Sequence, residues 1–140
     1  MKRHFVNLLV DAPATVAAFY TTHFELTEVF RSAWFVHLEG PHGIELGILR
    51  RPTELLPASA DSGPPNVMLT FVVDDVDAWV DAAQAAGVAI EQPPTNRFYG
   101  QRVALVRDPA GTWIDVSSPC DPDPNWANRL SPTDSGWQES

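Results

Sequence analysis

The 140-residue sequence is short of cysteine and of positive charge. Its single cysteine, Cys120, cannot form an internal disulfide and excludes every metal motif built from several cysteines. Only 9 Lys and Arg stand against 18 Asp and Glu, which leaves a formal charge of −9. A surface of this sign repels phosphate backbones and anionic lipid, so we expect neither nucleic acid nor a membrane as a partner.

Long hydrophobic runs are also missing. No apolar stretch approaches the ~20 residues that a membrane-spanning helix needs. The basic start is followed by an apolar stretch that Asn7 and Asp11 interrupt, so we expect no signal peptide. Together with the lone thiol, this favours a cytoplasmic protein. The length and the 44% hydrophobic fraction are typical of one globular domain with a sizeable core.

Turn residues and apolar periodicity divide the chain into two similar halves. In the first half they predict a helix that begins at Pro13, and in the second a helix capped by Asp74 or Asp75 and ended by Gly87. Strands are predicted, in chain order, at 5–10, 28–31, 34–39, 44–49, 67–73, 88–91, 101–107 and 112–117. The order β-α-β-β-β therefore occurs twice, which indicates two modules that share a core.

The repeat predicts an α+β fold in one domain over residues 1–119. Its two βαβββ modules span 4–49 and 66–118, and a Pro-rich linker at 50–65 joins them. The segment 120–140, rich in Pro, Asp and Ser, is interpreted as a C-terminal tail.

One segment carries a family resemblance. Residues 99–115 read Tyr-Gly-Gln-Arg-Val-Ala-Leu-Val-Arg-Asp-Pro-Ala-Gly-Thr-Trp-Ile-Asp. They resemble the final hairpin of the vicinal oxygen chelate superfamily, which contains glyoxalase I, extradiol dioxygenases and the bleomycin- and mitomycin-binding resistance proteins. The sequence of this segment is most similar to that of the drug-binding branch. The resemblance covers about residues 4–119 and implies a curved, cup-shaped mixed sheet with helices outside, and a homodimer.

The resemblance also implies where a metal would bind. Metal-dependent members carry four ligands, and their positions fall on Phe5, Glu45, Met68 and Asp115. Phe cannot ligate a metal, and the soft Met thioether suits a hard cation poorly. His4 is adjacent to Phe5, but strand alternation turns it to the opposite face. We therefore expect no metal and no other cofactor, with one divalent ion on Glu45 and Asp115 as the alternative.

The strand faces that carry these four positions also supply candidate binding residues, because side chains two positions apart share a face. Polar and aromatic groups there and nearby suit a site for a partly aromatic ligand. The predicted ligand-binding residues are Asn7, Trp34, Glu45, Thr70, Tyr99, Arg102, Trp113 and Asp115. Glu45 and Asp115 are also candidate catalytic residues, because a carboxyl group in an apolar cup can have a raised pKa and act as a base.

The other histidines show no ligand spacing. His23, His37 and His42 are scattered and are interpreted as surface or loop residues. The favoured hypothesis is a non-enzymatic protein that sequesters a small aromatic or antibiotic-like ligand. The alternative is an enzyme of the superfamily, a lyase, isomerase or dioxygenase, that depends on a metal or uses a pocket carboxylate as base.

Overall fold

The computed structural model describes residues 1, 3–53, 55 and 67–125. These belong to two compact units, one made of residues 1–69 with 107–113 and the other of 70–106 with the chain from 114 onward. Most of the predicted linker 50–65 and of the predicted tail 120–140 lies outside the described residues.

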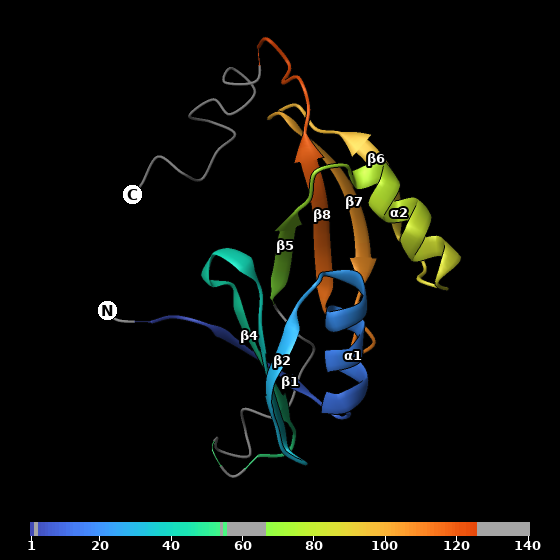
Figure 1. The fold of residues 1–140 in the computed structure, drawn as a ribbon. Helices are drawn as coiled ribbons and strands as arrows, with labels where there is room; N and C mark the ends of the chain where they lie inside the picture. Colours follow the sequence, from blue (N-terminus) through green and yellow to red (C-terminus); the bar gives the residue numbers. More distant parts are fainter. Residues whose placement is uncertain (2, 54, 56–66, 126–140) are drawn as a thin grey trace. The chain divides into compact units, whose positions relative to one another are not determined.

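The first module is a four-stranded mixed sheet with one helix (Figure 1). Its strands are hydrogen-bonded in the order β1-β4-β3-β2, with β1 parallel to β4 and the other pairs antiparallel. In chain order its elements are β1 (Val6–Val10), α1 (Pro13–His23), β2 (Thr27–Arg31), β3 (Phe35–Glu39), the 3₁₀ turn η1 (Pro41–Gly43) and β4 (Glu45–Arg50).

The second module repeats this arrangement. Its strands follow the order β5-β8-β7-β6, which matches β1-β4-β3-β2 element by element. The elements are β5 (Met68–Val72), α2 (Val76–Ala85), β6 (Gln92–Asn96), β7 (Gln101–Arg107) and β8 (Trp113–Pro119). The predicted α+β fold with two βαβββ modules is confirmed.

The helix ends follow from local chemistry. α1 begins at Pro13, where the missing N–H costs nothing. α2 is capped by Asp75, whose carboxylate accepts a hydrogen bond from the N–H of Ala78 at 3.1 Å. At its other end Gly87 and Val88 donate to the carbonyls of Gln84 and Ala83, and Gly87 has a φ of 91°. This pair of bonds is a Schellman motif.

The predicted strand at 88–91 is wrong. Val88 belongs to the end of α2, and the strand lies at Gln92–Asn96. Pro93 and Pro94 argued against a strand there because proline cannot donate to the sheet ladder. β6 is an edge strand, and its register with β7 shifts between Gln92 and Thr95, so both prolines are accommodated.

Burial alternates along β1 and along β8 as far as Val116, as expected for strands with one covered face. In β1, Leu8 and Val10 are buried while Asn7 is exposed; in β8, Ile114 and Val116 are buried on either side of Asp115. Fully burying each such aliphatic side chain contributes about 1.5–3 kcal/mol. The largest fully buried side chains are Tyr20, Leu38, Ile48, Ile114, Val10, Val36, Val76, Val106 and Val116.

Within the part of the chain that the structure describes, neither helix is long and apolar enough to cross a membrane.

Candidate functional site

The open face of the first sheet is built around a glycine. Asn7, Gly47 and His37 lie side by side on β1, β4 and β3, because Gly47 is the register partner of both neighbours. A Cβ on Gly47 would lie 2.0 Å from the Asn7 Oδ1 and 3.0 Å from the Phe35 ring. The absence of a side chain at Gly47 therefore makes the room that Asn7 occupies.

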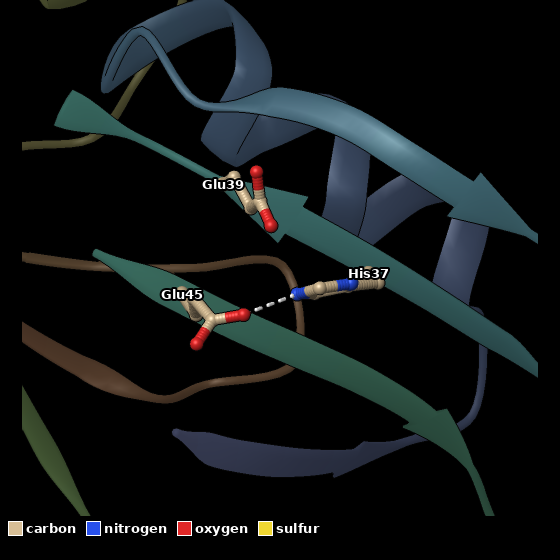
Figure 2. A group of neighbouring side chains, drawn as sticks. All are labelled: His37, Glu39 and Glu45. Carbon is tan, nitrogen blue, oxygen red and sulfur yellow. Dashed lines mark hydrogen bonds and ion pairs between the residues drawn. The ribbon is translucent and has the colours of Figure 1, made fainter. Parts of the chain in front are cut away.

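A histidine and two carboxylates gather beside this row. His37 and Glu39 come from β3 and Glu45 from β4, and Figure 2 shows their side chains directed toward one another. The Nε2 of His37 lies 3.0 Å from the Oε1 of Glu45. One ligand atom from each of the three residues lies within 4.8 Å of the others. We call this group the β3–β4 cluster.

Arg3 pairs with the cluster through Glu45 and His37. Its Nε donates to the Glu45 Oε1 and Oε2 at 2.9 and 2.8 Å, and its NH2 group contacts both Glu45 and His37. Hydrogen bonding to Arg3, and less strongly to His37, lowers the pKa of Glu45. The guanidinium of Arg3 also lies 4.9 Å from the centroid of the Phe5 ring, which is cation–π range.

His37 faces two competing partners. Its Nε2 can donate to Glu45 when it carries a proton, or accept from Arg3, 3.3 Å away, when it does not. His37 does not lie in a loop. It lies in β3 with its side chain only 14% exposed, held between an acid and a base.

The four positions at which the superfamily would bind metal do not form a ligand set in this chain. Phe5 offers no donor atom, and Met68 is an exposed thioether. Only Glu45 and Asp115, two of the four positions, carry side chains suited to such an ion. The residues therefore do not fit the superfamily's metal centre.

The second sheet carries three buried polar side-chain atoms that have no hydrogen-bond partner in the described part of the chain. Asp115 lies on β8, Gln101 on β7 and Gln92 on the edge strand β6. The Oδ1 of Asp115, the Oε1 of Gln101 and the Nε2 of Gln92 are each buried without a hydrogen-bond partner among the described residues. Arg97 completes this group, which we call the second-module polar group, by donating from NH2 to the Gln92 Oε1 at 3.1 Å.

Burial changes the acidity of Asp115. Loss of solvation raises its pKa, while a hydrogen bond with Ser117 and the charge of Arg97 act in the opposite direction. Asp115 is thus a carboxyl group in a partly desolvated place, and its Oδ1 is buried without a hydrogen-bond partner among the described residues.

The predicted aromatic residues are accessible. The side chains of Trp34, Tyr99 and Trp113 are all exposed to solvent. Trp34 lines a cavity of about 410 Å³ together with Arg50, Pro52, Thr53 and Leu55. Tyr99 packs edge-on against Phe98, and the guanidinium of Arg107 lies 4.0 Å from the centroid of the Trp113 ring.

Arg102 does not lie on the same face of the second sheet as Asp115. Arg102 forms a two-pronged ion pair with Asp77 of α2, at 2.8 and 2.9 Å, and also donates to Asn96. It therefore lies on the helix-covered side of β7. Thr70 is exposed on β5, beside β8, and Glu45 and Asn7 belong to the first sheet.

Sequence reasoning missed His37, Glu39, Gln92 and Gln101. A signal for the first two was available, because a hairpin drawn through the turn at 40–43 places Glu39 opposite Glu45 and His37 opposite Gly47. No comparable signal marks the two glutamines.

Comparison with known proteins agrees with this architecture. The family model described as the Glyoxalase/Bleomycin resistance protein/Dioxygenase superfamily matches residues 2–116. A search of curated proteins finds no match.

Solved structures share the fold at low sequence identity. A glyoxalase/bleomycin resistance protein/dioxygenase family enzyme from Burkholderia phytofirmans PsJN is 24% identical, with a TM-score of 0.72 over 81% of this chain and 95% of that one. A glyoxalase/bleomycin resistance protein/dioxygenase from Nocardioides is 22% identical, with a TM-score of 0.70 over 86% and 85%. Lactoylglutathione lyase from Agrobacterium tumefaciens is 22% identical, with a TM-score of 0.66 over 81% and 90%.

Proposed function

The chain belongs to the glyoxalase/bleomycin resistance protein/dioxygenase superfamily, and we propose that it binds and sequesters a small organic molecule that is partly aromatic. The observation that carries the proposal is the second-module polar group. Three of its buried side-chain atoms lack partners among the described residues. A buried polar atom without a partner costs about 1–3 kcal/mol, which a ligand recovers when it supplies the missing bond.

The unpaired atoms define the polar end of this ligand. The carboxylate oxygen of Asp115 and the amide oxygen of Gln101 accept hydrogen bonds, and the amide nitrogen of Gln92 donates. A ligand N–H or O–H would suit Asp115 or Gln101, and a ligand acceptor would suit Gln92. Amides, amidines and hydroxylated rings carry such groups.

An aromatic part is supported by the neighbouring side chains. Trp113 precedes Asp115 by two positions on β8 and therefore shares its face. The Trp113 side chain is exposed. Burying one ring against such a surface contributes several kcal/mol at ~25 cal/mol per Å², before the cost of association is subtracted.

Two features favour binding over turnover. The superfamily's metal positions include Phe5 and Met68, which cannot complete its ligand set. The sequence of the β7–β8 hairpin, with Gly100 before the strand and Asp108 to Gly111 in the turn, resembles that of the drug-binding branch. These features support our proposal that the chain sequesters an antibiotic-like compound.

An enzyme is the second candidate, and one observation favours it. Burial raises the pKa of Asp115, and a carboxyl group with a raised pKa is suited to accept a proton from a substrate near neutral pH. In this alternative Asp115 is the base of a metal-independent lyase or isomerase.

We also propose that the protein is a homodimer in the cytoplasm. The first proposal rests on the resemblance to the superfamily and the second on the single free thiol, Cys120. Light scattering at micromolar concentration tests the first, since a monomeric mass would contradict it.

A ligand screen with product analysis tests the proposed function. Tryptophan fluorescence and thermal shift report binding, and chromatography of each hit after long incubation reports turnover. We expect a hit that carries N–H or O–H donors and is recovered unchanged. Conversion of the hit, lost in Asp115→Asn while binding remains, would show that the protein is an enzyme instead.

A further inference from the structure

We propose that the β3–β4 cluster, His37, Glu39 and Glu45, is an exchangeable site for a first-row divalent metal ion, which competes with the guanidinium of Arg3. This inference goes beyond the proposed function and does not rest on it, because the second-module polar group shares no residue with the cluster.

The first support is the geometry of the three side chains. Glu39 and Glu45 are direct register partners on neighbouring strands, and His37 lies diagonally across from Glu45 (Figure 2). Ligand bonds of ~2.1 Å allow two ligand atoms of one ion to be at most about 4.2 Å apart. The His37 Nε2 and the Glu45 Oε1, 3.0 Å apart, already meet this limit. The remaining separations, up to 4.8 Å, close with a small rotation of the exposed Glu39 side chain.

The second support is the charge of the cluster. Two carboxylates directly opposite each other on paired strands repel, so this arrangement needs a cation. Arg3 supplies one, because its Nε donates hydrogen bonds to both oxygens of Glu45. A divalent ion supplies twice the charge and binds the imidazole nitrogen, which a guanidinium contacts only as a hydrogen-bond donor.

A metal ion can displace Arg3 from its ion pair with Glu45. Its side chain is about half exposed, near the start of the chain, and it precedes β1. Exposed ion pairs are weak because solvent screens them and long side chains lose entropy in forming them. A metal ion that binds the Glu45 oxygens therefore needs only to release Arg3 into water.

The donor set selects the class of ion. One imidazole and two carboxylates suit Zn²⁺, Ni²⁺ and Co²⁺, whereas Ca²⁺ and Mg²⁺ prefer oxygen ligands alone. Three protein ligands leave further coordination positions to water. This set comes from one module, and it shares only Glu45 with the four positions that the superfamily resemblance implies.

A cobalt titration of the full chain tests the inference. Isothermal calorimetry with Co²⁺ is expected to show one equivalent per chain, and a paramagnetically shifted imidazole proton in the NMR spectrum is expected to identify His37. His37→Asn and Glu45→Gln should each weaken Co²⁺ binding at least about tenfold. His37→Asn should also remove the shifted imidazole signal, which keeps the test independent of any stability change at Glu45.

The Co²⁺ affinity of an Arg3 variant distinguishes binding at this cluster from nonspecific binding. Arg3→Met should tighten Co²⁺ binding by up to about fivefold, because a competing cation is gone. Arg51→Met, which removes an arginine paired with Asp11, and His4→Asn are matched controls and should leave the affinity unchanged. Retention of wild-type affinity in His37→Asn would overturn the proposal, as would loss of binding in His4→Asn or an Arg3→Met variant no tighter than the wild type.

Discussion

The hydroxyl of Tyr20 donates a hydrogen bond of 2.7 Å to the carboxylate of Asp108, a residue 88 positions later in the sequence. The other oxygen of Asp108 accepts from the N–H groups of Ala110 and Thr112, each at 2.9 Å. Asp108 is only 4% exposed, and its buried charge is balanced by these three donors. The bond therefore holds the turn before β8 to α1.

Tyr20→Phe should destabilise the protein by about 1.5–3 kcal/mol, because it leaves an oxygen of a buried carboxylate without its donor. Urea unfolding followed by tryptophan fluorescence measures the change. Tyr99→Phe is the matched control, since Tyr99 is exposed, and should stay within about 0.5 kcal/mol of the wild type. Equal stability of the two variants would show that the Tyr20 bond contributes nothing net.

Gly47→Ala should cost about 1–3 kcal/mol, because the new Cβ overlaps the Asn7 Oδ1 at 2.0 Å. Introduced into an Asn7→Ala background, the same change should cost less, since only the looser contact with Phe35 at 3.0 Å remains. A double-mutant cycle by urea unfolding measures this coupling. Additive effects of the two substitutions would mean that Asn7 does not depend on the space above Gly47.

Asp115→Asn should stabilise the protein at pH 7. Burial raises the folded-state pKa of Asp115, so between the unfolded pKa, about 3.9, and the folded one the native chain holds a proton that the unfolded chain has lost. The free energy of unfolding of the wild type therefore falls as pH rises through this window, and it stays lower at higher pH. Because the side chain is only partly buried, screening keeps the gain below about 1 kcal/mol.

Urea unfolding of the wild type and Asp115→Asn at pH 4 and pH 7 checks the sign. The free energy of unfolding of Asp115→Asn should exceed that of the wild type at pH 7, and the difference should shrink toward pH 4. A variant that is less stable than the wild type at pH 7 would show that the carboxylate is favourably paired in the folded protein.

Most of the fold could be predicted because its signals are local. Pro13, Asp75 and Gly87 mark helix ends by their own chemistry, and the module order appears twice in the sequence. The strand β6 escaped prediction because Pro93 and Pro94 are acceptable only at a sheet edge. Sequence periodicity does not say which strand will be the edge.

The candidate sites were less predictable because they depend on neighbours across strands. The position of Asp115 on an open face followed from alternation, but its desolvation did not. Gln92 and Gln101 are ordinary residues in the sequence, and only the packing around them buries their amide atoms. His37 was missed because ligand spacing was sought along the chain, whereas its partner Glu45 lies across a hairpin.

The affinity of Asp115→Asn for a screened ligand, measured by calorimetry beside Asp77→Asn, tests the proposed function most directly. Asp77 is an exposed carboxylate already paired with Arg102, so its substitution controls for charge. The account predicts that Asp115→Asn weakens binding about tenfold to a hundredfold, through one lost hydrogen bond to a charged group, while Asp77→Asn binds as the wild type does and the ligand is recovered unchanged. Equal affinity of the two variants, or a ligand converted to product, would contradict it.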